Sequence, residues 1–286
     1  MIKEVIMKTL FIHEKGNQYI AQLKEAFNKK NISVEAIDIS ELGLLTEGKQ
    51  TTLIFGGLKL DEFDSCFLDV GVQFTQFVEP LLDEFSQKGI YCQVKPDSFS
   101  ILSSKAFQIT TLNAHKIKTP DTNIFGSSSF INASLKEFSF PLILQVFDGY
   151  KKIQDVLVES EKSLLSIVKS IKSDFDTLLL QDFFEKDLDV SAIIGEQVFT
   201  VRRPWNKEKF EYVKKGSGIT LSEKEQSDII KAKNTIGLDI AVIKSIQGNI
   251  VSVKSSVDFM FFQEILGKNL FEATAEFYLS KIKKSD

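Results

Sequence analysis

Few residues of this chain have types and spacing that could do chemistry. Arg202 and Arg203 end an apolar segment just before a Pro-Trp dipeptide, and two adjacent guanidinium groups can bind an anion through bidentate hydrogen bonds. The alternative is that both pair with the abundant Asp and Glu of the surface. His13 and His115 lie far apart and no Ser or Cys motif accompanies them, so a catalytic triad is not predicted.

Cys66 and Cys92 are the two cysteines, and both lie in apolar, strand-like surroundings. Neither belongs to a CxxC pair or has a histidine nearby, so the spacing favours buried free thiols over a metal or nucleophile site. Free thiols are typical of a reducing compartment, and we therefore expect a cytoplasmic protein.

The composition of the chain limits the kinds of partner that we expect it to bind. The chain has 286 residues, 43% of them hydrophobic and 26% charged, which is ordinary for two or three small globular domains. The net charge of -4 is spread over mixed charges, so nucleic acid is not an expected partner. The N-terminus has no signal-peptide pattern, and no apolar run approaches the roughly 20 residues that span a membrane.

The first hundred residues alternate short apolar runs with amphipathic segments, which predicts a doubly wound parallel sheet covered by helices. Apolar faces predict helices over 19–30 and 73–88. The expected strands are 5–12, 32–37, 52–55 before Gly56-Gly57, 66–70 before Gly71, and 90–94.

The order of elements then changes to an α+β pattern. Ser103-Ser104 should cap a helix that runs through His115. PLILQV and VLVES predict a strand pair around a turn, and TLLLQDFF, DVSAIIGE, QVFTVRR and FEYVKK predict four strands of a largely antiparallel sheet. A capping box of Ser222 and Glu225 should start a helix that Gly237 ends. Two strands around Gly248-Asn249 and a helix over about 268–283 complete the pattern.

This order of modules resembles the ATP-grasp superfamily, and most closely its RimK-like branch of amino-acid and peptide ligases. The stretches that carry the resemblance are FDSCFLDVG, SSKAFQITTLNAHKIKTPDT, FPLILQVFDGYKKIQDVLVES, LLLQDFFEKDLDVSAIIGEQVF and LSEKEQSDIIKAKNTIGLDIA. The resemblance implies an N-terminal pre-ATP-grasp α/β domain (1–97), a central ATP-grasp subdomain with a phosphate-covering loop (98–178) and a C-terminal subdomain with a hinge (179–286). It also implies ATP as cofactor and an amino acid or carboxylate acceptor as partner, and leaves a homo-oligomer open.

Carried over residue by residue, the resemblance implies a phosphate contact for Lys105, whose alternative is a solvated helix face. Gln145 stands where the family has a second lysine, and it can donate a hydrogen bond but cannot neutralise charge. The loop 148–155 stands in place of a glycine-rich phosphate loop with a single glycine. Lys151 and Lys152 can restore positive charge there, or can lie in a solvated hairpin tip.

The segment after 178 resembles the family's hinge. Gln181, Asp182 and Phe183 would read the adenine edge, and Glu185 or Asp187 would hold the ribose. The resemblance places Arg202 and Arg203 where relatives face substrate or phosphate with basic residues.

The metal positions differ from the family pattern. Lys244 stands where an acid is expected, and Ser252, Lys254 and Ser256 are the residues at the paired Glu and Asn positions. An ammonium group repels Mg²⁺ but can itself neutralise phosphate. We therefore assign no metal ligand and do not predict a bound Mg²⁺.

Two hypotheses remain open at this point. The chain is either a divergent ATP-binding carboxylate–amine ligase acting through an acyl phosphate, or a catalytically inactive ATP-grasp protein that serves as a nucleotide-binding or protein-interaction module.

Overall fold

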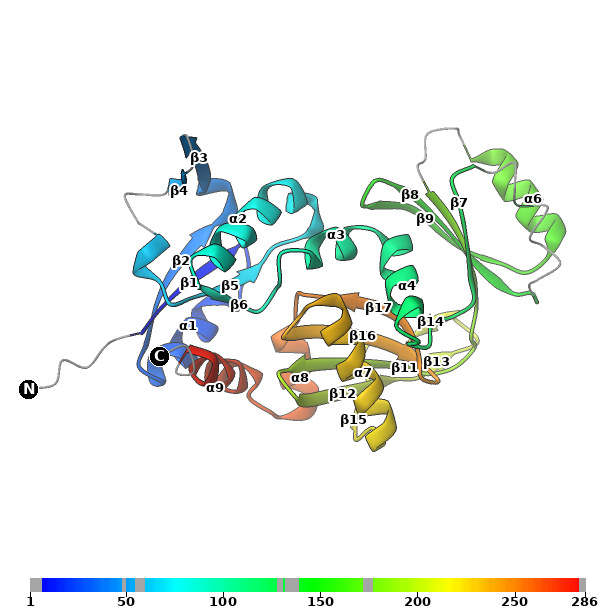
Figure 1. Cartoon of the computed structure of the whole chain (residues 1–286). Coiled ribbons are helices and arrows are strands. Elements are labelled where there is room, and N and C mark those ends of the chain that lie inside the picture. Colours follow the sequence, from blue (N-terminus) through cyan, green and yellow to red (C-terminus); the bar gives the residue numbers. More distant parts are fainter. Residues whose placement is uncertain are drawn as a thin grey trace, which may run out of the picture.

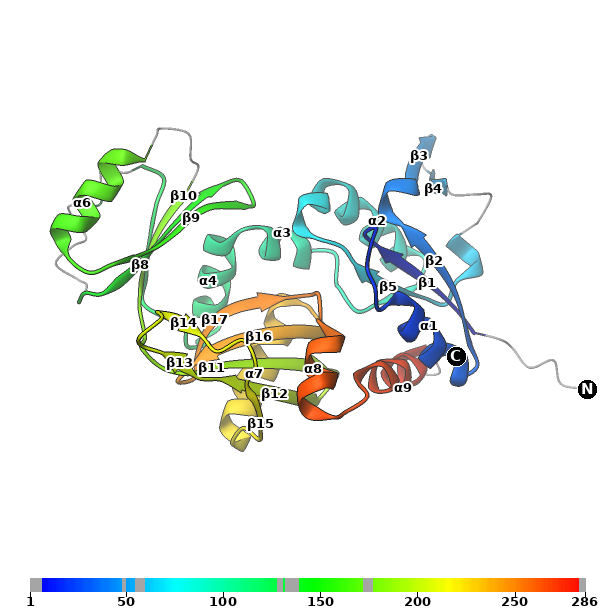
Figure 2. The same cartoon turned by 180° about the vertical axis from the view of Figure 1, so that it is seen from behind.

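A computed structural model shows three sheets of four or five strands that follow one another along the chain, each with helices packed on it (Figures 1 and 2). The structure describes residues 7–47, 50–54, 60–127, 131, 139–171 and 177–282. Three expectations fall wholly or partly outside these residues: the start of the first strand together with the N-terminal signal region, the Gly56-Gly57 turn, and the end of the last helix.

The N-terminal sheet is parallel, with strand order β2-β1-β5-β6. Its strands are β1 (Met7–His13), β2 (Ile32–Asp38), β5 (Ser65–Asp69) and β6 (Tyr91–Cys92). Helices α1 (Ile20–Lys29) and α2 (Thr75–Gln87) cover opposite faces, because α1 packs on Phe11 and Phe67 while α2 packs on Leu10 and Leu68. The predicted doubly wound arrangement is confirmed for these four strands.

The third expected strand does not enter this sheet. It forms β4 (Gln50–Ile54), which pairs antiparallel with β3 (Gly43–Glu47) as a separate hairpin. A parallel partner requires a long crossover, whereas β3 ends only a few residues before β4 begins, so the local pairing is the one formed. Short 3₁₀ turns lie beside these strands: η1 (Ile39–Glu41), η2 (Leu60–Glu62) and η3 (Val72–Phe74).

Two helices lead to the central sheet, α3 (Ser98–Ser103) and α4 (Lys105–Ala114). Ser104 caps α4 by accepting a hydrogen bond from the backbone N–H of Phe107 at 3.2 Å, as the sequence predicts. The central sheet is antiparallel with order β7-β10-β8-β9, and α6 (Glu161–Ser170) packs on it. Its strands are β7 (Thr122–Phe125), β8 (Leu142–Asp148), β9 (Lys151–Val158) and β10 (Thr177–Asp182).

Strand β10 corrects the expected grouping of strands. TLLLQDFF was expected to begin the C-terminal sheet, but β10 pairs with β7 and β8. The border between the two sheets therefore follows Asp182, whereas the expected border at 178/179 falls inside the strand. An apolar run predicts a buried strand without specifying its partner, and this pairing joins segments distant in sequence.

The C-terminal sheet has the order β15-β12-β11-β16-β17. Its strands are β11 (Leu188–Ile194), β12 (Gln197–Arg203), β15 (Ser217–Ile219), β16 (Ile240–Ile246) and β17 (Asn249–Lys254). The expected FEYVKK strand is instead β14 (Glu211–Tyr212), which pairs only with β13 (Trp205–Asn206) in a separate ribbon. Pro204 separates this ribbon from β12.

Helix α7 (Glu223–Ile236) covers one face of this sheet and has the predicted ends. Ser222 and Glu225 form the capping box, and Gly237 follows at φ 85°, a left-handed conformation that glycine adopts without strain. The other face packs on α8 (Phe259–Leu266) and α9 (Leu270–Ile282), and α9 returns to lie against α1 of the N-terminal domain (Figure 1). Across the described residues, none of the helices combines the length and the apolar character needed to cross a bilayer.

Candidate functional site

A cleft of about 590 Å³ lies between the central and C-terminal sheets. Strands β8, β9 and β10 supply one wall, strands β12, β16 and β17 supply the other, and α4 contributes Lys105. Of the thirteen residues expected to contact the nucleotide, nine line this cleft: Lys105, Gln145, Lys152, Gln181, Asp182, Phe183, Arg203, Lys244 and Lys254. The four others do not line it: Lys151, Glu185, Asp187 and Arg202.

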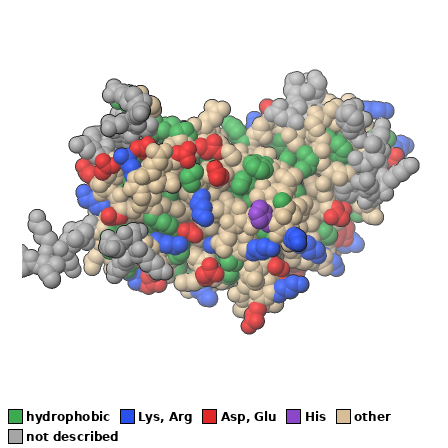
Figure 3. All heavy atoms as spheres, viewed as in Figure 1, with side chains coloured by type: hydrophobic (Ala, Val, Ile, Leu, Met, Phe, Trp, Pro, Cys, Tyr) green, Lys and Arg blue, Asp and Glu red, His purple; other side chains and the backbone are tan. Residues whose placement is uncertain are grey.

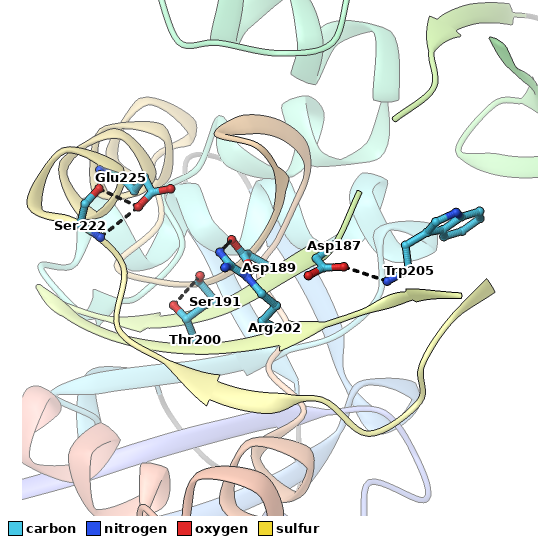
Figure 4. A network of polar contacts seen from close by, with 8 residues as sticks. All are labelled: Asp187, Asp189, Ser191, Thr200, Arg202, Trp205, Ser222 and Glu225. Carbon is cyan, nitrogen blue, oxygen red and sulfur yellow. Dashed lines mark hydrogen bonds and ion pairs between the residues drawn. The ribbon is translucent and has the colours of Figure 1, made fainter. Parts of the chain in front are cut away.

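The adjacent arginines point to opposite faces of β12, as neighbouring strand residues do. Arg202 faces α7 and donates two hydrogen bonds, of 2.7 and 2.8 Å, to the carboxylate of Asp189 (Figure 4). Asp189 is only 6% exposed, and its hydrogen bond raises the pKa of Arg202. Arg202 therefore pairs with an acid, which was the alternative for both arginines, whereas Arg203 lies in the cleft.

Arg203 is held by neutral partners. Its Nε donates to the carbonyl of Val213 at 2.8 Å and its Nη2 to that of Tyr212 at 3.4 Å. Backbone carbonyls orient the guanidinium without cancelling its charge, so the charge stays available to an anion in the cleft.

The two acids expected to hold a ribose have other partners. Asp187 accepts a hydrogen bond from the backbone N–H of Trp205 at 3.0 Å (Figure 4). Glu185 forms an ion pair with Lys207 at 3.4 Å. A ribose contact from either residue stays a prediction.

The hinge residues lie at the end of β10. The amide of Gln181 donates to the hydroxyl of Thr122 at 2.9 Å, and the backbone N–H of Asp182 donates to the carbonyl of Asp121 at 3.0 Å. Burial raises the pKa of Asp182, and the charge of Asp121 raises it further. Phe183 packs edge-on against Trp205, with ring centroids 5.4 Å apart.

Lys105 opens helix α4, and its Nζ donates to the carbonyl of Val251 on β17. Burial, and to a lesser extent the neighbouring charge of Lys152, lower the pKa of Lys105 to about 8 against a smaller opposing effect of Asp155. The alternative that Lys105 lies on a solvated helix face is therefore wrong.

Gln108 fixes the same helix to the same strand. Its amide donates to the carbonyl of Val253 at 2.9 Å and accepts from the N–H of Val253 at 3.0 Å. Sequence reasoning missed this residue, which lies one helical turn after Lys105 and could have been found by that spacing.

The β8–β9 hairpin supplies the remaining wall. Ile143, Gln145 and Phe147 all line the cleft because alternate residues of β8 share one face, a period the sequence already shows. Lys151 lies exposed at the hairpin tip, which was the alternative to a phosphate contact for this residue. Lys152 is also exposed and forms an ion pair with Asp155. Buried Oε1 of Gln145 has no hydrogen-bond partner among the described residues, so the cleft contains an open acceptor.

Lys244 and Lys254 lie at the other end of the cleft. Lys244 is opposite Ser252 across the β16–β17 pair, and Lys254 lies two residues further along β17 on the same face. Burial lowers the pKa of Lys244, and Lys254, Arg203 and Lys152 each lower it further.

The residues present do not fit a metal ion held by the protein. Among the described residues, no group of three His, Cys, Asp or Glu side chains could hold one. Asp155 and Asp182 are the carboxylates that line the cleft. The sheet register places them three residues along and two strands across, about 14 Å apart, which is too far to share an ion.

The cleft as a whole is cationic, with five Lys or Arg side chains against two acids in its lining. On the face drawn in Figure 3, by contrast, Lys and Arg alternate with Asp and Glu. A second cavity of about 340 Å³ adjoins the cleft and shares Lys105, Phe147 and Lys254 with it. It extends to residues 70–73 of the N-terminal domain.

A cleft between two α+β subdomains, preceded by a doubly wound domain, defines the ATP-grasp architecture. A family model for the RimK-like ATP-grasp domain matches residues 103–276, and the chain belongs to this family. The predicted fold class and family are thereby confirmed.

Relatives and solved structures agree with this assignment. A probable alpha-L-glutamate ligase of Haemophilus influenzae is 29% identical over 203 residues, 67% of each chain. One of Shewanella loihica is 22% identical over 97% of each chain. The ATP-grasp ligase PsnB, solved with a precursor peptide and AMPPNP, superposes with a TM-score of 0.74 at 11% identity, covering 96% of this chain and 98% of its own. PsnB has also been solved with Mg and ADP.

Proposed function

We propose that the cleft between the central and C-terminal subdomains binds an adenine nucleotide, ATP or ADP. The observation that carries this proposal is the charge of the lining, five cations against two acids in a protein whose net charge is -4. Concentrated positive charge in an apolar-walled cleft suits a polyphosphate.

The two ends of the cleft differ in polarity, as do the base and the phosphates of a nucleotide. The end near β10 offers Phe183, Phe184 and Leu188 beside backbone groups, which suits a base. Lys244 on β16 and Lys254 on β17, with Lys105, lie further along the sheet and suit phosphates, whereas Arg203 on β12 lies beside Leu188. We also propose that the protein is cytoplasmic, which the free thiols of Cys66 and Cys92 support.

Isothermal titration calorimetry with ATP and ADP tests the proposal. Lys254→Met should weaken binding about tenfold, since a charge-assisted contact to phosphate is worth more than 1 kcal/mol. Lys231→Met removes the same side chain from an exposed position of α7 and serves as the matched control. Absence of binding, or equal effects of the two variants, contradicts the proposal.

A second function, carboxylate–amine ligation, is favoured by the relatives named probable alpha-L-glutamate ligase. In that reaction a carboxylate takes the terminal phosphoryl group of ATP with loss of ADP, and an amine then displaces phosphate to form an amide. The second cavity, open to the nucleotide cleft at Lys105, has room for an acceptor.

Release of ADP separates this function from that of an inactive nucleotide-binding module. Ligation predicts that glutamate together with an amine or peptide stimulates ADP release, and that Lys105→Ala abolishes it. An inactive module binds the nucleotide and returns it intact under the same conditions.

A further inference from the structure

Three cations line the cleft from three strands of the C-terminal sheet, with Lys244 between Arg203 and Lys254 in the sheet register. Lys244 lies on β16, Lys254 on β17 and Arg203 on β12, and all three line the cleft. The register makes Lys244 and Lys254 diagonal neighbours on one face, with Cα atoms about 7–8 Å apart. Two ammonium groups at that spacing can contact the same phosphate chain.

Within the part of the chain that the structure describes, none of these three side chains forms an ion pair, and Arg203 bonds only to backbone carbonyls. Their mutual repulsion lowers the pKa of Lys244 beyond the effect of burial. An anion would relieve this repulsion, whereas another cation would add to it.

A divalent ion would occupy an unfavourable place here. The cleft carboxylates, Asp155 and Asp182, cannot chelate one ion together, and Asp155 already pairs with Lys152. A magnesium ion carried in on a nucleotide would meet the Lys244 ammonium instead of a carboxylate.

We propose that Lys244, Lys254 and Arg203 take the place of a divalent cation, so that the nucleotide binds as its metal-free anion. This inference rests on the proposed function, because it concerns the form in which the same ligand binds. A triphosphate carries about four negative charges near neutral pH, and these three cations with Lys105 match that number. Added Mg²⁺ competes with the protein cations for the same phosphate oxygens and therefore weakens binding.

Calorimetric titration of ADP and ATP in EDTA and in excess Mg²⁺ tests the inference. We expect binding at least about tenfold tighter in EDTA, because like charges in the cleft repel the metal complex. Lys244→Asp should reverse this preference by supplying a metal ligand. Lys244→Met should weaken metal-free binding without creating dependence on Mg²⁺, and it keeps the inference testable should the aspartate variant not fold. Lys231→Asp, the same charge reversal on exposed α7, should behave as the wild type.

The outcomes separate the inference from the function on which it rests. Binding that requires Mg²⁺, or that is equal with and without it, overturns the inference and leaves nucleotide binding standing. Absence of nucleotide binding in both solutions refutes the proposed function. Inorganic tripolyphosphate then decides the role of the cations: metal-free binding that Lys244→Met weakens upholds it, and absence of binding overturns it.

Discussion

Replacing Lys105 by methionine should change how the stability of the protein depends on pH. The pKa of Lys105 is about 8 in the folded protein against an ordinary value of 10.5, because its ammonium group is buried. The unfolded chain therefore binds more protons between these two values, so the contribution of Lys105 to stability rises with pH across that window. Below pH 8 the charged side chain carries its full destabilising cost.

The two pKa values set the magnitude. They give a cost of about 3 kcal/mol at pH 7, which falls to about 1 kcal/mol at pH 10. Lys105→Met carries no such cost at either pH. Its stability advantage over the wild type should therefore shrink by about 2 kcal/mol between pH 7 and pH 10. The lost hydrogen bond to Val251 is made by either protonation state of lysine and largely cancels from this comparison.

Urea unfolding of both proteins at the two pH values, followed by circular dichroism, measures the effect. Burial raises the pKa of Tyr19 and Tyr91, so both proteins lose stability near pH 10 as the unfolded tyrosines ionise. That loss is common to the two proteins and does not enter their difference. A difference in unfolding free energy that is the same at both pH values refutes the burial of a charged Lys105.

Further predictions concern the arginines and the thiols. Arg202→Met leaves buried Asp189 without its partner and should cost about 2 kcal/mol in urea unfolding, with nucleotide affinity unchanged in calorimetry. Arg203→Met should do the opposite, weakening nucleotide binding about tenfold while changing stability little, because its two hydrogen bonds to carbonyls are exposed or only partly buried. Burial raises the pKa of the Cys66 thiol, so a disulfide reagent at pH 8 should titrate Cys92 alone until the protein unfolds.

Local chemistry accounts for what the sequence predicts well. Ser222, Glu225 and Gly237 bound helix α7 because each end is satisfied by residues within one turn. The four parallel strands of the first sheet are likewise recognisable as short apolar runs, and β1 and β5 are each followed by a turn and an amphipathic helix.

Pairing between distant segments explains what the sequence could not predict. The partners of β10 are set by contacts across the central sheet, and its own residues are apolar enough for either sheet. The face of the sheet to which each arginine points also depends on register. A shift of one residue would turn Arg202 into the cleft and Arg203 toward α7. Asp155 was not predicted in the site since its place opposite Gln145 follows only from the β8–β9 pairing.

The cations of the cleft and the structural cation Arg202 are held in chemically different ways. Arg202 is positioned by a carboxylate, which orients it and cancels its charge at once. Lys105 and Arg203 are positioned by backbone carbonyls, which orient them through hydrogen bonds but leave a full positive charge. A partly buried cation with no acid beside it keeps an uncompensated charge, which costs folding free energy. Their uncompensated charge is therefore the feature that most directly ties this structure to an anionic ligand.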